Sequence, residues 1–352
     1  MIVDAHNDFL VEVTHFRHEA HPFRDRWLDQ LRRGGVGLQV CPASVEVTEL
    51  PEWGLRRSLT EIAECHRAAA DDADDVLIVR DAHDLETVLA DGRIGLLLSM
   101  EGAEPLGYDP TLIDLFWLLG VRMLALTWNR RNPFADGLGE ATDGGLSALG
   151  RELVDRAAGL GMIFDLAHAS QKTFLQVLER APDAPVLVSH ACCRAVYDTP
   201  RNLSDDQLRA LRDHDGVLAV MAIPLTVDQV APSLERVVDH IDHAVNVMGI
   251  EHVGIGADFM AQIVASGAEP AFQATSLMPD GMSCGAAVPG LSGPADYPAL
   301  VRVMEARGYT GDALEALLSG NLLRVIARAL ASRDTPAFEH KASRPGQDGW
   351  HD

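Results

Sequence analysis

Histidines and carboxylates directly follow short apolar runs along this 352-residue chain. The first case is a His-x-Asp pair, His6 and Asp8, which comes after Ile2-Val3. Residues i and i+2 of an extended segment point to the same side, so this imidazole and this carboxylate can face one ion. A lone pair of this kind more often belongs to a hydrogen-bonded turn that closes a strand. The positions of the other candidate ligands therefore decide between the two interpretations.

Four further side chains of these types lie just past apolar runs: Glu101, His168, His190 and Asp258. With the first pair they make three histidines and three carboxylates. Imidazole and carboxylate donors in this ratio suit two divalent cations of borderline hardness, and zinc is the best match. The sequence thus predicts a metal centre, provided that the ends of these runs meet in space.

The elements that must position these side chains are short β-rich runs separated by longer amphipathic stretches. Eight strands are expected, at residues 2–5, 36–42, 94–100, 122–127, 162–167, 185–189, 217–222 and 252–257. Most are continuously apolar, as parallel strands covered by helices are. Helical patterns occupy residues 55–70, 146–159, 171–180, 203–213, 234–248, 297–307 and 312–331, and Ser204 is the expected N-cap of the fourth.

This alternation predicts an α/β protein with the (β/α)8 TIM-barrel fold, in which the active site lies at the C-terminal ends of the strands. The alternative is a doubly wound open sheet, but no G-x-G-x-x-G follows any expected strand. Residues 1–331 are expected to form a single catalytic domain. Residues 260–294 are expected to be a loop, either a lid or simply mobile, and the polar tail 332–352 is expected to be disordered.

Composition excludes several classes of partner. A formal charge of −23 argues against nucleic acid, because an acidic surface repels phosphates. No apolar run is long enough to cross a bilayer and Met1 leads directly into a strand, so a cytoplasmic protein without a membrane partner is expected. The five cysteines show no C-x-x-C spacing, which predicts neither a disulfide framework nor a thiolate zinc site.

Taken together, the motifs resemble those of the membrane dipeptidase (renal dipeptidase) family, peptidase family M19, within the amidohydrolase superfamily. The resemblance spans nearly the whole chain. It rests on these segments: Val3 to Asp8, Met100-Glu101-Gly102, Phe164 to His168, Ser189-His190, Arg201-Asn202, Gly256 to Phe259 and Gly320 to Val325. It implies that His6 and Asp8 hold one zinc ion, that His168 and His190 hold a second, and that Glu101 bridges the two.

The resemblance also implies a reaction. Two close cations lower the pKa of a bridging water and polarise the scissile carbonyl, so that hydroxide attacks the amide bond. Asp258, beside the first ion, would take the proton from this water and pass it to the leaving amine. Arg201 would bind the free carboxylate of a dipeptide or an N-acyl amino acid. A homodimer is expected by resemblance alone.

Two departures from the family pattern concern the substrate. The dipeptidases commonly have a histidine after Leu-Thr at the fourth strand, where this chain has Trp128, which can donate a hydrogen bond but has no basic nitrogen. Trp128 is therefore a candidate substrate contact or a packing residue, and Asn129 or Arg130 would compensate. After Asp258 the chain continues Phe259-Met260-Ala261, in place of the family's Phe-Asp-Gly.

These departures leave three functions open. The first is a zinc-dependent dipeptidase, and the second is the same metal chemistry on a lactam, a modified peptide or another amide. The third is a barrel kept as a binding protein without catalysis. The complete ligand set disfavours the third, because a silent barrel has no need for six convergent polar groups.

Several other residues have less specific patterns. Asp165 and Asp4 are compatible with orienting a metal ligand and equally with a bystander position. His240 and His243 flank the apolar face of their helix beside acidic residues, so surface ion pairs are expected. His18 is expected to be a solvated loop histidine.

Overall fold

The computed structural model describes residues 1–45, 49–268 and 285–331. Within these residues one parallel sheet of nine strands is present. Its strands are β1 (Ile2–Asp4), β2 (Val36–Ser44), β3 (Val76–Ile78), β4 (Ile94–Glu101), β5 (Met123–Ala125), β6 (Ile163–Asp165), β7 (Val186–Ala191), β8 (Val217–Val220) and β9 (Val253–Ile255).

The sheet closes into a barrel because β2 pairs with both β1 and β4. From β4 the order continues through β5, β6, β7 and β8 to β9, which pairs with β1. The closed ring has eight strands, so the predicted TIM barrel is confirmed. Strand β3 lies beside this ring, on residues 94–96 of β4, and β5 takes residues 99–101 of the same strand. Strand β3 was not predicted from the sequence.

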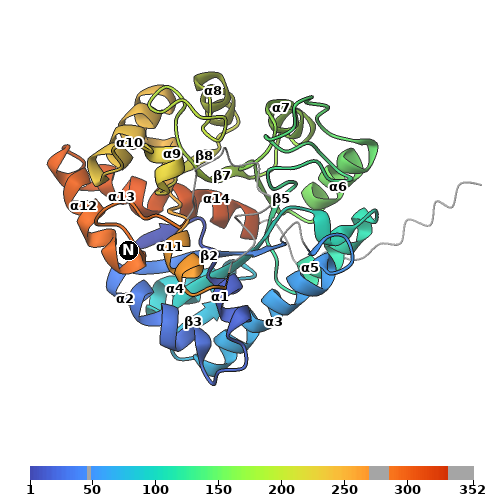
Figure 1. The fold of residues 1–352 in the computed structure, drawn as a ribbon, viewed down its shortest axis with the longest axis horizontal. Helices are drawn as coiled ribbons and strands as arrows, with labels where there is room; N and C mark the ends of the chain where they lie inside the picture. The colour runs from blue at the N-terminus through green and yellow to red at the C-terminus, as the bar shows by residue number, and fades with distance from the viewer. Residues whose placement is uncertain (46–48, 269–284, 332–352) are drawn as a thin grey trace, which may run out of the picture.

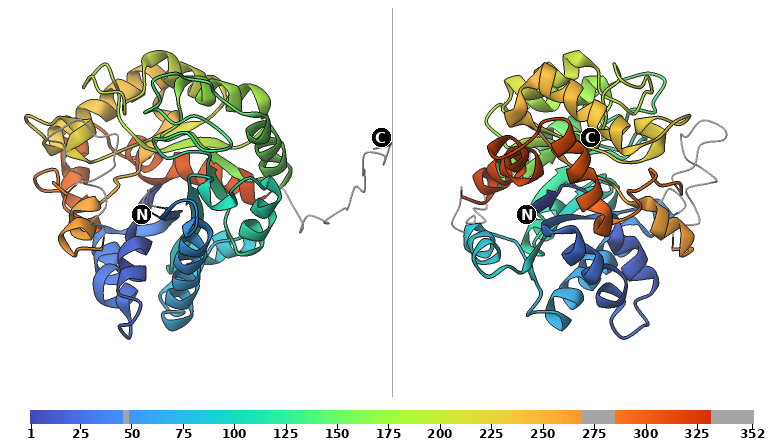
Figure 2. Two further views of the ribbon diagram at one scale, coloured as in Figure 1. Left: turned by 45° about the vertical axis from the view of Figure 1, so that its right-hand side comes forward. Right: turned by 90° about the vertical axis from the view of Figure 1, so that its left-hand side faces the viewer.

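Helices surround the strands (Figure 1), and the two rotated views show them around the same central barrel (Figure 2). They are α1 (Phe9–His15), α2 (Asp29–Gly34), α3 (Gly54–Asp71), α4 (Ala82–Asp91), α5 (Ile113–Leu118), α6 (Ala148–Gly159), α7 (Gln171–Arg180), α8 (Asp205–Asp213), α9 (Pro224–Val227), α10 (Leu234–Met248), α11 (Met260–Ala265), α12 (Tyr297–Ala306), α13 (Asp312–Glu315) and α14 (Asn321–Leu330). Ser204 caps α8 as predicted, with a reciprocal hydrogen bond from its backbone N–H to Gln207.

Two expectations are corrected. The segment 260–294 does not begin as a loop, because its first residues form α11, whose Met260 and Ile263 are buried. Residues 269–284 of that segment, and the tail 332–352, lie outside the described residues. His240 is not a surface residue: it is fully buried, and its ring bonds the backbone of Cys193 and Val227.

The hydrophobic core has two parts. One part lies between the strands and the surrounding helices, and the other fills the N-terminal half of the barrel, where α14 packs Leu322 and Ile326 against β-strand residues such as Leu97. Side chains alternate along each strand, so Leu97, Ser99 and Glu101 of β4 face the interior in sequence. Glu101 therefore faces inward at the C-terminal end, above an apolar plug.

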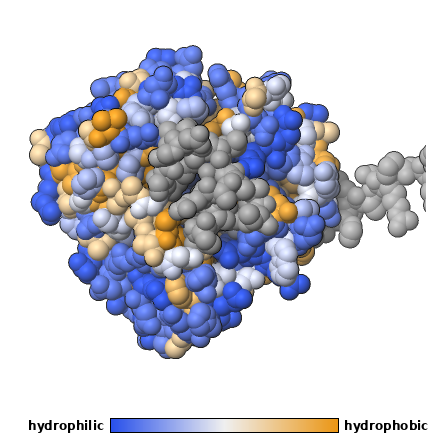
Figure 3. Space-filling view, in the orientation of Figure 1, coloured by the Kyte–Doolittle hydropathy of each residue, from blue (hydrophilic) through white to orange (hydrophobic). Residues whose placement is uncertain are grey.

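None of the described helices is long and apolar enough to cross a membrane. In the view of Figure 3 the surface is mostly hydrophilic, with hydrophobic residues scattered over it. This polar surface agrees with the high formal charge of −23.

Candidate active site

The site begins with His6 and Asp8, which follow β1 at the C-terminal rim of the barrel. His6 Nε2 lies 3.5 Å from Asp8 Oδ1 and 3.7 Å from Glu101 Oε1. One ligand atom each from His6, Asp8 and Asp258 lie within 4.8 Å of one another, and all three residues are buried. A second group of this kind consists of His6, Glu101 and His190. The two groups share His6, so they form one continuous cluster.

The other half of the cluster is built around Glu101, the last residue of β4. Its Oε1 lies 3.2 Å from His168 Nε2 and 3.5 Å from His190 Nε2. The two Nε2 atoms are 2.8 Å apart. A guanidinium N–H of Arg201 points to His168 Nε2 at 3.0 Å and donates to the backbone carbonyl of His190 at 2.8 Å. All six predicted ligands and Arg201 thus meet in one place.

Two of these ligands have an unusual backbone conformation. His168 follows β6 with φ of 62°, and Asp258 follows β9 with φ of 60°. This left-handed region is disfavoured for residues other than glycine, and such strain concentrates at functional sites. Beside Asp258, a side chain on Gly256 would meet the Ser189 carbonyl oxygen at 1.8 Å, so only glycine lets β9 approach β7 this closely.

His190 is aimed at the site by an irregularity in β7. Leu187 and Ser189 belong to the interior side of that strand, so strict alternation would turn the next residue outward. The pairing register of β7 with β8 shifts between Val188 and Ala191, which is where His190 turns toward His168. Such irregularities in strand pairing commonly redirect a side chain next to an active site.

The buried carboxylates of the cluster would be stabilised by nearby positive charge. Burial, reinforced by the neighbouring Asp8, raises the pKa of Glu101 well above its usual value. Burial likewise raises the pKa of Asp258 to about 7. Burial alone would lower the pKa of His6, but Glu101, Asp8 and Asp258 raise it to about 10. Glu101 and Asp258 therefore hold a proton more readily than usual, and bound cations would replace that proton.

His168 and His190 show the opposite behaviour. Burial lowers the pKa of both imidazoles well below the usual value, and the positive charges of Arg201 and His6 lower it further. Both rings are neutral at pH 7 as a result. A neutral imidazole is the form that binds a metal ion.

Buried donor atoms without hydrogen-bond partners also indicate that the candidate ligands suit a divalent metal ion. Among the described residues, the buried Asp8 Oδ1, Asp258 Oδ1 and both ring nitrogens of His6 have no hydrogen-bond partner. Buried polar atoms without partners are rare and costly in folded proteins. Ions bound between these atoms would satisfy them, and the mixed nitrogen and oxygen donor set is one that zinc accepts.

The predicted substrate residues lie on the His168 side of the cluster. The Trp128 ring centroid is 5.9 Å from that of His168, and Asn129 Oδ1 lies 2.6 Å from His168 Nδ1. Asn129 was predicted to contact the substrate, whereas here its amide contacts a candidate ligand. Ser189, whose hydroxyl joins His190 to Asp165, was not predicted as a site residue; its position directly before a candidate ligand was the available signal.

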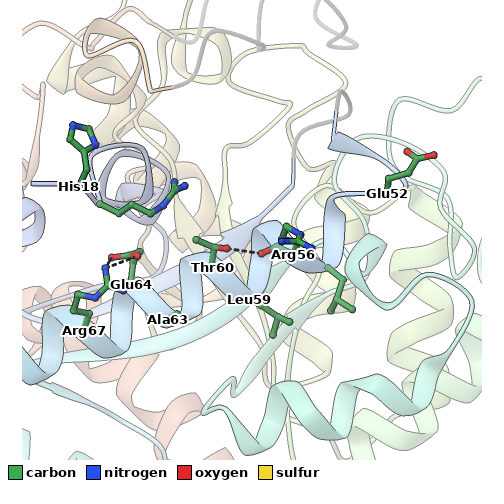
Figure 4. Close-up of a pocket in the computed structure, with 10 residues that line it drawn as sticks. His18, Glu52, Arg56, Leu59, Thr60, Ala63, Glu64 and Arg67 are labelled. Carbon is green, nitrogen blue, oxygen red and sulfur yellow. Dashed lines mark hydrogen bonds and ion pairs between the residues drawn. The ribbon is translucent and has the colours of Figure 1, made fainter.

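A separate groove of about 890 Å³ runs along the outer face of α3 (Figure 4). Its lining includes Arg17 and His18 from the loop after α1, and Arg56, Glu64 and Arg67 from α3. Glu64 and Arg67 form an ion pair at 2.7 Å. None of the six candidate ligands lines this groove, so His18 belongs to a surface apart from the metal cluster, and its exposure agrees with the expected solvated loop.

A (β/α)8 barrel with histidines and carboxylates gathered at its C-terminal rim defines a metal-dependent hydrolase. Comparison with known proteins narrows this class. The profile of the membrane dipeptidase family (peptidase family M19) matches residues 1–280. The chain therefore belongs to this family of metallopeptidases, which are hydrolases acting on peptide bonds.

Individual relatives agree. The chain is 31% identical to dipeptidase aclJ of Aspergillus oryzae over 360 residues, which cover 94% of this chain and 80% of that one. It is 28% identical to human dipeptidase 3 over 361 residues, which cover 98% of this chain and 67% of that one. The solved structure of dipeptidase AC, a family M19 metallopeptidase, superposes with a TM-score of 0.81 at 25% identity. The superposition covers 94% of this chain and 99% of that one. A Rhodobacter sphaeroides metallopeptidase, solved with a phosphinate mimic of L-Ala-D-Ala, shares the fold with a TM-score of 0.80 at 24% identity. This superposition covers 93% of this chain and 99% of that one.

Proposed function

We propose that this protein is a dipeptidase that uses two zinc ions at the rim cluster to hydrolyse the amide bond of a dipeptide or an N-acyl amino acid. One observation carries the proposal: three histidines and three carboxylates converge at the barrel rim, with buried donor atoms that lack partners. Family membership supports hydrolysis of peptide bonds.

The ligands divide between two ions. In this proposal His6 and Asp8 would hold one ion, His168 and His190 would hold the other, and Glu101 would contribute to both. The bound cations would supply Lewis acidity toward the scissile carbonyl and would lower the pKa of a bound water. The neutral rings of His168 and His190 leave the three carboxylates to balance the charge of the ions.

Asp258 and Arg201 act on the substrate. Asp258, with one carboxylate oxygen unpaired among the ligands, takes the proton of the attacking water and returns it to the leaving amine. Arg201 binds the free carboxylate of the substrate, a task suited to the fork of N–H donors on a guanidinium. The phosphinate dipeptide mimic in the Rhodobacter sphaeroides structure supports a dipeptide as the substrate class.

The test is the variant Asp258→Asn, which keeps the size of the side chain and removes its basic oxygen. We expect the bound zinc to stay near two ions per chain, while kcat for a dipeptide falls by about 10²–10⁴-fold. Zinc is measured by elemental analysis, and hydrolysis is measured on a panel of L,L- and L,D-dipeptides. A variant that keeps both its zinc and most of its kcat would refute the assigned role.

Trp128 favours one alternative substrate class. Its ring centroid lies 5.9 Å from that of His168, so an apolar indole lies beside the cluster where the family's dipeptidases commonly have a histidine. A lactam or a modified peptide would suit such a surface better than a plain dipeptide. Two bound zinc ions without cleavage of any dipeptide would favour this alternative, and Trp128→His would then be expected to restore dipeptide hydrolysis.

A further inference from the structure

The two histidines on the Glu101 side share a feature that His6 lacks. Each has its outer ring nitrogen, Nδ1, held by a neighbouring side chain. His168 Nδ1 lies 2.6 Å from Asn129 Oδ1, and His190 Nδ1 lies 2.7 Å from Ser189 Oγ. A hydrogen bond at one ring nitrogen fixes which nitrogen carries the proton and how the ring is oriented.

The tautomer of His168 follows from its two partners. A guanidinium only donates, so the Arg201 N–H at 3.0 Å requires a free lone pair on His168 Nε2. The proton of the neutral ring then lies on Nδ1, where it is donated to the Asn129 oxygen. Nε2, the nitrogen facing Glu101, is thereby left unprotonated and able to bind an ion.

The tautomer of His190 is fixed by a second pair of residues, Ser189 and Asp165. The Ser189 hydroxyl lies 2.5 Å from Asp165 Oδ2, and the other Asp165 oxygen accepts the backbone N–H groups of Ser189 and Ala167. The single hydroxyl proton goes to the Asp165 carboxylate, so Ser189 Oγ accepts the Nδ1 proton of His190. The lone pair on His190 Nε2 faces that on His168 at 2.8 Å, an arrangement that a cation stabilises.

His6 has no such support. Among the described residues its Nδ1 has no hydrogen-bond partner, and its Nε2 lies 3.5 Å from Asp8 Oδ1 and 3.7 Å from Glu101 Oε1. The ring stacks on that of His190, with centroids 3.6 Å apart, but stacking does not select a tautomer. Asp8 Oδ1 and Asp258 Oδ1, its partners in the cluster, also have no hydrogen bonds among those residues.

We propose that the two ion positions differ in affinity, and that the position of His168 and His190 fills first because both rings are held in the binding tautomer before an ion arrives. Asn129, Ser189 and Asp165 are positioning residues that act through the two histidines. This inference rests on the proposed two-metal function and deepens it. It also gives Asn129 a role toward a ligand, where the sequence analysis assigned one toward the substrate.

The test is a zinc titration of the metal-free, full-length protein against a chelating indicator. We expect two phases of unequal affinity, with the tight phase weakened by about 10–100-fold in Asn129→Leu and in Ser189→Ala. The weak phase is expected to stay within about threefold of its original affinity. Asn129→Asp, which keeps an oxygen acceptor at that place, is expected to restore most of the tight phase. Ser319→Ala, at the opposite end of the barrel, is the control and is expected to change neither phase.

His6→Ala assigns the phases, because in the proposed arrangement His6 is a ligand of the other position. We expect this variant to keep the tight phase and to lose the weak one, and cobalt(II) absorption spectra of each variant with one equivalent bound check the assignment. Two phases of equal affinity, or an Asn129→Leu variant altered only in the weak phase, would overturn the inference while leaving the two-metal proposal intact. A protein that binds no zinc would overturn the proposed function itself.

Discussion

At the scale of single residues, the site collects features that are unfavourable elsewhere in a folded chain. His168 and Asp258 have positive φ angles of 62° and 60°, and such conformations cost on the order of 1–3 kcal/mol each. Glu101 is buried with a strongly raised pKa. The strained and poorly satisfied residues coincide with the candidate ligands, which is the distribution expected where function sets the structure.

His240 supports a prediction about pH. Its buried ring accepts the Cys193 N–H and donates to the Val227 carbonyl, and burial lowers its pKa from the usual 6.5 to about 4. The unfolded state therefore binds the proton more tightly between pH 6.5 and 4, so the stability due to this group is lost as pH falls through that window. We expect this group to lower the free energy of unfolding by about 2 kcal/mol between pH 7.5 and pH 5.

The measurement is denaturant unfolding of the original protein and of His240→Gln at both pH values. The stability difference between the two is expected to shrink at pH 5, because glutamine does not titrate. His243→Gln serves as the control, since His243 is only half-buried and pairs with Asp205 at 2.7 Å. Equal loss of stability in the original protein and in His240→Gln would show that His240 does not titrate as described.

At the scale of elements, α14 closes the N-terminal end of the barrel beneath the site. Its buried residues pack with interior side chains of several strands, among them Leu97 and Leu187. Ile326 is fully buried in this cluster, so Ile326→Ala leaves a cavity and is expected to lower the free energy of unfolding by about 2–5 kcal/mol. Thermal or denaturant unfolding measures the effect.

The matched control for this prediction is Leu118→Ala, because Leu118 lies on the outer helix α5 and is 53% exposed. Its truncation is expected to change the free energy of unfolding by about 0.5 kcal/mol at most. Similar losses in the two variants would mean that α14 does not pack as a plug.

The elements also show how far a sequence predicts this fold. The eight ring strands were predictable because each is a mostly apolar run that lies between amphipathic stretches. An eight-stranded ring has no place for β3, which pairs with β4 outside the ring, and α11 lies in a segment whose composition resembles a loop. All six candidate ligands were found from position alone. The turn of His190 and the contact of Asn129 with His168 could not be predicted, since both depend on contacts between neighbouring strands.

At the scale of the whole molecule, charge and folding are coupled through the site. The chain carries a formal charge of −23, and three of its carboxylates are buried together at the rim. Without cations, keeping Glu101 and Asp258 in their charged forms costs free energy, as their raised pKa values indicate. Bound divalent ions would remove that cost. The folded state, which alone brings the ligands together, would gain the whole binding free energy.

Zinc is therefore expected to raise the stability of the whole protein. Ligand that binds only the folded state stabilises it by about 2.7 kcal/mol per site when the free ion is at 100 times its Kd. The thermal unfolding midpoint of metal-free protein should thus rise by several degrees on addition of zinc, and fall again with excess chelator. Magnesium at the same concentration is the control and should have little effect, because it prefers sites rich in oxygen and water. If zinc restored hydrolysis without moving the midpoint, the ions would not be bound by the cluster that folding assembles.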